Sequence, residues 1–259
     1  MSKLIDKLSK QRQSEPQQMG FMLRKAEVEK PKMLLLAELS ADNLGKWGEA
    51  LKAADGLIVD VNKPEDLTSA EKASQGDNLV PVGAWLKTSS AAVLKKAADT
   101  ECDFLTFSSD IPVTLTRKEK MGRILDIDIN LSEGLLRSAG ELPLDACIVT
   151  GKHIELDLTL NRLMYIQRLL LVVNKPVLVV IENGLSAPEL QSLWDMGVGG
   201  VVVEVADQRF AEKLADLRGI IDKLEAPAFR KKAKSTAILP RMQAEAPQPE
   251  HEEEEEEDE

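Results

Sequence analysis

Eight short apolar runs recur along this chain, and their number constrains its fold more than any other feature of the sequence. The runs span Met33–Leu39, Gly56–Val61, Leu79–Trp85, Asp103–Ser108, Arg123–Ile129, Asp145–Thr150, Pro176–Ile181 and Gly199–Val205. Most begin about two dozen residues after the previous one, which leaves room for a strand, a loop, a helix and a return. Short apolar strands that alternate with helical stretches indicate βαβ units and a parallel sheet. Eight such units predict an α/β fold of the (β/α)₈ barrel type, the TIM barrel.

A doubly wound open sheet is the competing architecture. It usually has fewer strands and a glycine-rich turn after the first one, whereas residues 39–42 contain no GxGxxG pattern. The helix starts also support the repeat, because Ser186 and Glu189 have the spacing of a capping box, with Pro188 in the first turn. The barrel is therefore expected over residues 31–226.

Both ends of the chain lie outside this repeat. Leu4, Ile5 and Leu8 share one helical face and a polar stretch follows them, so residues 1–30 are expected to form a helical extension and a linker. In residues 227–259 a basic cluster precedes a composition of proline, alanine, glutamine and glutamate. Such a segment cannot bury enough apolar surface to offset the entropy of ordering, and it is predicted to be a disordered tail, basic and then acidic.

The negative charge of the chain is concentrated in that tail. Nine acidic side chains lie in residues 250–259, and removing them from the net charge of −11 leaves −2 on the rest. The folded part is therefore not expected to offer a basic face to nucleic acid. No run approaches the roughly 20 apolar residues of a membrane span. The start of the chain lacks the apolar stretch of a signal peptide, and the two cysteines have no zinc spacing. We expect a soluble, cytoplasmic protein with no nucleic-acid or membrane partner.

In a barrel of this type the active site lies at the C-terminal ends of the strands, where every second residue faces the lumen. Polar and apolar side chains alternate from Asp126 to Asn130, which predicts that Asp126, Asp128 and Asn130 point inward. Further acids and bases stand near strand ends: Glu38, Asp60, Glu182, Glu204, Lys87, Lys152 and His153. Two interpretations remain open. These groups form an internal ion-pair network without chemistry, or they hold Mg²⁺ or act as acid and base.

Three of these residues are the predicted catalytic groups. Asp128 on the fifth strand is the first candidate, since a carboxylate in the lumen needs a partner, a metal or a proton. Lys87 on the third strand is its expected partner, because both side chains could project into the same mouth. Glu38 on the first strand completes the set. A functional Asp128–Lys87 pair and a structural ion pair are both compatible with the sequence.

The seventh unit carries the clearest binding signal. Glu182, Asn183 and Gly184 end a strand and lead into the helix that Ser186 caps, and the next strand begins at Gly199. This stretch resembles the last two units of indole-3-glycerol phosphate synthase and its phosphate-binding barrel relatives. The resemblance implies that the Gly184 amide contacts a phosphate, with Asn183 and Ser186 beside it, because glycine lets the backbone approach an anion closely. A glycine that only permits a tight strand-to-helix turn is the alternative.

The chain departs from that family at other positions of the site. Glu204 and Asp207 follow the eighth strand where the family has a second glycine, and two carboxylates repel a phosphate unless a cation intervenes. Ser40 and Trp85 stand where the synthase has catalytic lysines, so the synthase activity itself is not expected. The leading hypothesis is a lyase or isomerase acting on a small phosphorylated metabolite. The alternative is a catalytically degenerate barrel that serves as a binding or assembly module. The leucine-rich segment 156–173 suggests a second subunit packed on that helix, as in a homodimer.

Overall fold

A closed barrel forms the centre of the protein. A computed structural model describes residues 2–12, 32–44, 53–75, 80–117, 121–128, 130–150, 158–181, 185–204 and 210–225. Eight parallel strands follow one another around the barrel in sequence order. The first strand also pairs with the last, from Leu34 opposite Gly200 to Glu38 opposite Glu204, which closes the sheet. The predicted (β/α)₈ fold is confirmed, and the open doubly wound sheet is excluded.

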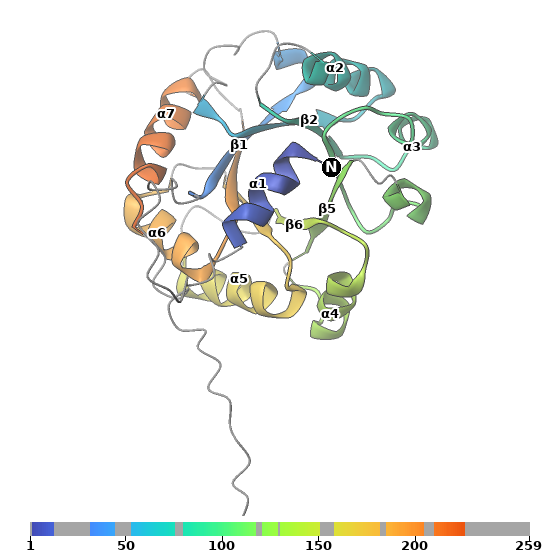
Figure 1. Ribbon diagram of the computed structural model, residues 1–259. Coiled ribbons are helices and arrows are strands. Elements are labelled where there is room, and N and C mark those ends of the chain that lie inside the picture. The colour runs from blue at the N-terminus through green and yellow to red at the C-terminus, as the bar shows by residue number, and fades with distance from the viewer. Residues whose placement is uncertain are drawn as a thin grey trace, which may run out of the picture.

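Each of the eight predicted apolar runs overlaps one strand. The strands are β1 (Leu34–Ser40), β2 (Gly56–Val61), β3 (Val82–Leu86), β4 (Phe104–Phe107), β5 (Gly122–Ile127), β6 (Ala146–Val149), β7 (Val177–Ile181) and β8 (Gly200–Glu204). The helices are α1 (Lys3–Arg12), α2 (Pro64–Gln75), α3 (Ala91–Ala97), α4 (Glu133–Glu141), α5 (Leu160–Val173), α6 (Ala187–Met196) and α7 (Phe210–Ile221), with short 3₁₀ turns at Ala41–Asn43 and Val113–Arg117. Helices α2 to α7 surround the barrel (Figure 1).

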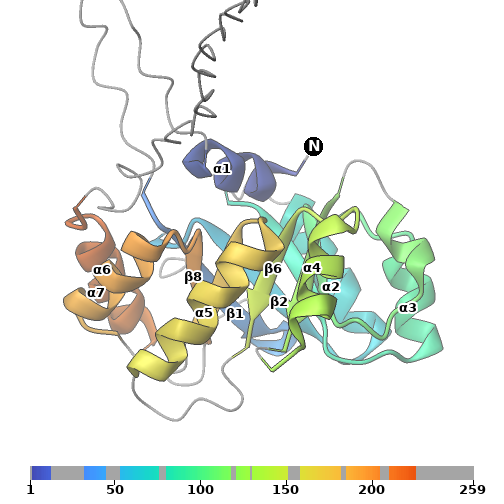
Figure 2. The ribbon, with the colours of Figure 1, turned by 90° about the horizontal axis from the view of Figure 1, so that it is seen from below.

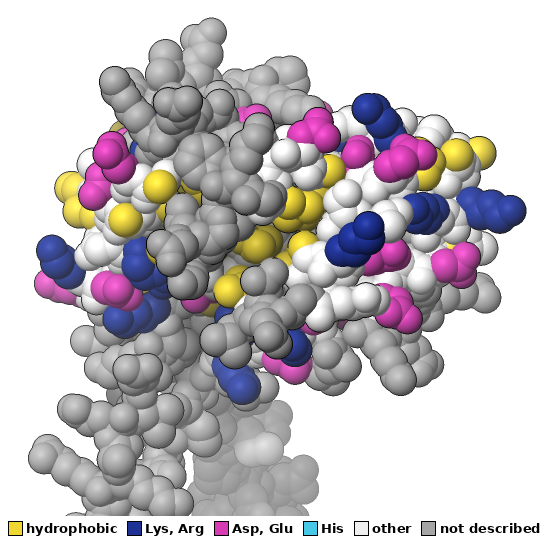
Figure 3. Space-filling model, turned by 90° about the horizontal axis from the view of Figure 1, so that it is seen from above, with side chains coloured by type: hydrophobic (Ala, Val, Ile, Leu, Met, Phe, Trp, Pro, Cys, Tyr) yellow, Lys and Arg dark blue, Asp and Glu magenta, His cyan; other side chains and the backbone are white. Residues whose placement is uncertain are grey.

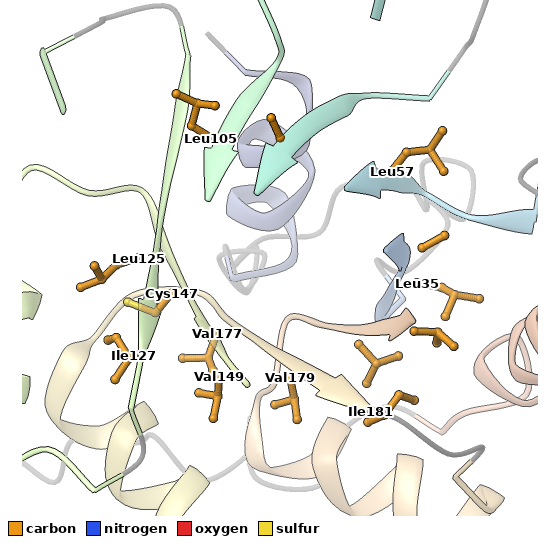
Figure 4. Packing of buried hydrophobic residues seen from close by; sticks show 14 of the residues in the cluster. Leu35, Leu57, Leu105, Leu125, Ile127, Cys147, Val149, Val177, Val179 and Ile181 are labelled. Atoms are coloured by element: carbon orange, nitrogen blue, oxygen red, sulfur yellow. The ribbon is translucent and has the colours of Figure 1, made fainter. Parts of the chain in front are cut away.

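The strand side chains alternate between two cores, as the pleat of a strand requires. The outer core lies between the strands and the helices, and ten of its side chains are labelled in Figure 4: Leu35, Leu57, Leu105, Leu125, Ile127, Cys147, Val149, Val177, Val179 and Ile181. The inner core fills the barrel with the residues between them, which include Leu36, Ile58, Trp85, Phe104, Ile124, Ile148, Leu178 and Val202. The interior of the barrel, below the C-terminal ends of the strands, is therefore packed with apolar side chains.

Helix α1 closes the N-terminal end of the barrel (Figures 1 and 2). Leu4 and Leu8 are fully buried and belong to the inner core. Asp103, just before β4, caps this helix: its carboxylate accepts hydrogen bonds from the Ser2 hydroxyl (2.8 Å) and from the amides of Lys3 (2.8 Å) and Leu4 (3.0 Å). The predicted N-terminal helix is confirmed, and it leaves the opposite end of the barrel for a site.

A glycine permits this close packing of α1. A Cβ atom on Gly122, the first residue of β5, would lie 2.7 Å from Ile5 Cγ1 and 2.9 Å from both Phe104 Cβ and Ser2 Oγ. Any larger residue would displace α1 or β4. The absence of a side chain on Gly122 is therefore part of how the N-terminal end is sealed.

Several predicted segments lie outside the described residues. The linker after α1, the whole predicted tail (residues 227–259) and residues 151–157 belong to them, so the predicted domain boundaries stay predictions. A long helix was expected from residue 156, and helix α5 begins at Leu160. Thr159 caps it: its hydroxyl accepts a hydrogen bond from the Arg162 amide at 3.3 Å.

Charges of both signs are mixed on the face shown in Figure 3, where Lys and Arg side chains stand among Asp and Glu side chains. Within the described ranges, every helix is too short or too polar to cross a membrane.

Candidate active site

The barrel interior changes from apolar to polar toward the C-terminal ends of the strands. Six inward-facing polar residues mark this change: Glu38, Asp60, Lys87, Thr106, Asp126 and Thr150. Each stands two positions beyond an inner-core residue of its strand, and therefore on the same face. They come from β1 to β6 or from the residue just after these strands, so they line one arc of the mouth where barrel enzymes carry their chemistry.

Lys87 joins the first three strands at this end. Its Nζ lies 2.6 Å from Glu38 Oε1 and 3.3 Å from Asp60 Oδ1. The same ammonium lies 3.3 Å from the centroid of the Trp85 ring, at cation–π distance. The side chains are 7% (Glu38), 21% (Lys87) and 20% (Asp60) exposed, so solvent screens these charges only weakly. We refer to these four residues as the Lys87 cluster.

The Lys87 cluster gives Glu38 an unusual proton affinity. The pKa of Glu38 is raised from 4.5 to about 7: burial is the main cause, the nearby charge of Asp60 adds to it, and Lys87 opposes it. A carboxyl group with a pKa near neutrality exists in both protonation states at neutral pH. This is the condition under which a side chain both takes up and returns a proton effectively.

Asp128 is not part of the Lys87 cluster. Strand β5 ends at Ile127, and the Asp128 carboxylate accepts hydrogen bonds from the Asn130 amide (2.8 Å) and from Asn130 Nδ2 (3.1 Å). This local turn takes Asp128, which is exposed, out of the strand alternation. The expected Asp128–Lys87 pair is therefore corrected: Lys87 is paired with Glu38 and Asp60.

The remaining lumen acids have separate environments. Asp126 points inward as predicted, and the Thr150 hydroxyl donates a hydrogen bond to its Oδ1 at 3.3 Å. Glu204 is exposed at the end of β8. Glu182, Lys152 and His153 lie outside the described residues. Within the described ranges, no group of three or more His, Cys, Asp or Glu side chains is placed to hold a metal ion, so Mg²⁺, one of the two alternatives for the lumen acids, has no ligand set there.

Of the predicted phosphate-binding residues, Ser186 alone lies within the described ranges, and Asn183 and Gly184 do not. The Ser186 amide donates to Glu189 Oε2 at 2.8 Å and its hydroxyl lies 2.5 Å from the same atom. These hydrogen bonds lower the pKa of Glu189. The N-terminus of α6 thus holds an anion of its own chain, in the position that a helix N-terminus offers to any anion.

Two residues of the site were not selected from the sequence. Asp60 was noted only as one acid among several, and Thr106 was not noted. The signal for Asp60 was its position: Asp60 is opposite Trp85 in the β2–β3 pair, and Trp85 is opposite Thr106 in the β3–β4 pair. Strand alternation and this register would have placed all three on the lumen face of neighbouring strands.

Comparisons with known proteins support the fold. No family model and no curated protein matches the chain. A mutant tryptophan synthase alpha-subunit from Pyrococcus furiosus superposes with a TM-score of 0.56 at 14% identity, covering 74% of this chain and 98% of that one. A chain of the tryptophan synthase α2β2 complex from the same organism gives a TM-score of 0.56 at 13% identity, with the same coverage. A protein of Aquifex aeolicus VF5 gives 0.56 at 14% identity, covering 76% and 93%.

These structures are similar to the chain in their barrel, and sequence identity this low carries no more than the fold. The class that fold and site together define is a (β/α)₈-barrel protein with a charged, partly buried cluster at the C-terminal mouth of the barrel.

Proposed function

We propose that this protein is an enzyme, a lyase or isomerase, that acts on a small phosphorylated metabolite at the C-terminal mouth of its barrel. One observation carries the proposal: the Lys87 ammonium lies 2.6 Å from a buried Glu38 carboxylate, whose pKa burial raises to about 7. Lyases and isomerases that move a proton need such a carboxyl group. The barrel is also the fold of the tryptophan synthase alpha-subunits with which the chain superposes.

Glu38 is the proton carrier in this proposal. Its carboxylate takes a proton from a substrate carbon or hydroxyl group, and the electron pair of the broken bond moves into the substrate toward an oxygen. Lys87 stabilises the negative charge that develops there, because a fixed cation in a weakly solvated site acts strongly on new charge. Glu38 then returns the proton to a neighbouring atom, which completes an isomerisation, or to a leaving group, which completes an elimination.

The phosphate of the substrate would bind at the β7–α6 connection. The resemblance of residues 182–186 to phosphate-binding barrels supports Gly184, Asn183 and Ser186 as its contacts. Ser186 would exchange the carboxylate of Glu189 for the phosphate. Gly184→Val should then weaken binding of phosphorylated compounds, whereas Gly134→Ala should not, because the position on α4 has open space for a Cβ atom.

A screen tests the proposal. Small phosphorylated metabolites are added, with and without Mg²⁺, to the parent protein, to Glu38→Gln and to the surface control Glu133→Gln, and unfolding temperatures are measured. A ligand at one hundred times its Kd stabilises the protein by about 2.7 kcal/mol. The proposal expects such a ligand, with turnover that Glu38→Gln abolishes and Glu133→Gln keeps. A parent protein that no compound stabilises, or turnover that survives Glu38→Gln, refutes it.

A second candidate function is a non-catalytic assembly module, and an exposed apolar stripe favours it. Leu160 (80% exposed), Met164 (70%) and Leu171 (73%) lie on one face of α5. Helix α4, which packs against α5, has exposed Leu135, and Leu142 just after α4 is exposed too. Exposed apolar side chains, methionine among them, are typical of the centre of a subunit interface.

This stripe would join two copies of the chain in a homodimer. Light scattering on the parent protein and on Met164→Glu tests that reading. A dimer that Met164→Glu dissociates supports it, and a monomeric parent protein refutes it.

A further inference from the structure

Two carboxylates of the Lys87 cluster lie against one ammonium. Lys87 Nζ is 2.6 Å from Glu38 Oε1 and 3.3 Å from Asp60 Oδ1, so these two oxygen atoms are at most about 6 Å apart. Both acidic side chains face the lumen, because Leu36 and Ile58, two positions earlier in β1 and β2, belong to the inner core. Charges of the same sign at this separation interact strongly where solvent is largely excluded.

With all three groups ionised, the cluster carries one excess negative charge. Two carboxylates face one ammonium, and the side chains are 7% (Glu38), 20% (Asp60) and 21% (Lys87) exposed. An uncompensated charge is costly in such surroundings, so the uptake of one proton by a carboxyl group stabilises the cluster. The protonated carboxyl group is also a hydrogen-bond donor, whereas two ionised carboxylates can only accept.

Glu38 is the group whose proton affinity responds to this arrangement. Burial is the main cause of its raised pKa, and Asp60 adds to it through its charge and through a hydrogen bond between the two side chains, while Lys87 opposes it. Other acids near the mouth are not among these causes. Glu204, opposite Glu38 on β8, is exposed, and Asp126 belongs to β5. Asp60 is therefore the acidic partner of Glu38.

We infer that Glu38 and Asp60 act as a carboxyl pair that shares one proton beside the Lys87 ammonium, which makes Asp60 a positioning residue of the proposed reaction. The inference rests on the proposed function and adds a second acid to its site. Asp60 acts through its neighbour: its negative charge makes Glu38 a stronger base than an ordinary carboxylate, and it holds the Lys87 ammonium close to both groups.

The pair couples proton transfer to the position of the cation. Glu38 forms an O–H bond with the proton that the substrate loses, and the electron pair of the broken bond moves toward a substrate oxygen. When the Lys87 ammonium turns toward that oxygen, it compensates the two carboxylates less. Their repulsion then favours the protonated form of Glu38, so the proton is taken up while the new negative charge is stabilised. Asp60 stays ionised and draws the ammonium back when the proton has been returned.

The first test needs no substrate. Infrared spectroscopy distinguishes protonated from ionised carboxyl groups, and the difference between a protein and the same protein with Glu38→Gln isolates the titration of Glu38. In Asp60→Asn, which keeps the shape and removes the charge, this titration should move to lower pH by about one unit or more. Asp126→Asn is the matched control, because this inward acid is not among the charges that act on Glu38, and the titration should stay unchanged.

An unchanged titration of Glu38 in Asp60→Asn, or an equal shift in Asp126→Asn, would overturn the inference. Asp60→Ser, which is smaller and also neutral, provides the same measurement if Asp60→Asn does not fold. If neither variant folds, Asp60 serves the fold and the inference fails as well.

The second test uses a phosphorylated metabolite that the parent protein converts. In Asp60→Asn the acid limb of kcat/KM should move to lower pH together with the titration of Glu38, and the plateau should fall severalfold, because a weaker base takes the proton more slowly. A rate lowered by the same factor at every pH would indicate a structural role and overturn the inference. If the parent protein converts no metabolite, the proposed function fails, and the carboxyl pair stands or falls on the titration alone.

Discussion

Replacing Glu38 by glutamine should remove a specific pH dependence from the stability of the protein. The folded protein raises the pKa of Glu38 to about 7, and the ordinary value is 4.5. Between these two values the folded state binds more protons than the unfolded state, so stability falls as the pH rises through this window and levels off above it. One pH unit corresponds to about 1.4 kcal/mol, so the decrease from pH 4.5 to 7 should be about 3 kcal/mol.

Chemical unfolding followed by fluorescence, at several pH values across this window, measures the effect. In Glu38→Gln the decrease should vanish, leaving a difference from the parent protein that grows with pH. Glu133→Gln is the matched control: Glu133 forms an exposed ion pair with Arg137, and its loss should leave the shape of the curve unchanged. Parallel curves for the parent protein and Glu38→Gln would refute the reasoning, because they would show that the folded state does not hold this proton.

Three further results are expected. Lys87→Met should destabilise the protein by about 2 kcal/mol at neutral pH and less in mild acid, where Glu38 is protonated; equal losses at both pH values would contradict this. Asp103→Ala should lower the free energy of unfolding by about 1–2 kcal/mol, because α1 loses three hydrogen bonds at its start. Proteolysis should then release the N-terminal segment faster, and an unchanged cleavage rate would argue against the cap. Burial raises the pKa of Cys147 to about 12, so a thiol reagent at mildly alkaline pH should modify it only after unfolding, and rapid modification of the folded protein would contradict this burial.

The architecture was predictable because it depends on local composition. Each strand is a short apolar run, and eight such runs with helical spacers have few arrangements other than a closed barrel. The N-terminal helix followed from Leu4, Ile5 and Leu8 on one face. Its position over the end of the barrel did not follow, since that depends on Asp103 and on the missing side chain of Gly122, far along the chain.

The site was predictable only as a list of inward-facing residues. Alternation placed Glu38 and Lys87 on the lumen face, but their pairing depends on how three strands are staggered around the barrel. The choice of Asp128 as partner continued the alternation past Ile127, where the turn with Asn130 ends the strand. A hydrogen bond between a side chain and a nearby amide competes with strand structure, and alternation alone cannot reveal it.

Thr106 illustrates a different limit. One threonine in an apolar run is ordinary in a sequence, because threonine favours strands and its hydroxyl usually finds a partner. That no described residue forms a hydrogen bond with the Thr106 hydroxyl becomes visible only when the surroundings of Thr106 are placed in three dimensions.

Transfer of a proton by Glu38 is the central claim, and hydrogen exchange in the substrate tests it most directly. Phosphorylated metabolites that stabilise the protein are incubated with it in D₂O and followed by NMR. The account predicts that the parent protein introduces deuterium at one carbon of such a compound, that Glu38→Gln abolishes this incorporation, and that Glu133→Gln preserves it. Incorporation at the parent rate by Glu38→Gln, or none by the parent protein with any compound that it binds, would contradict the account.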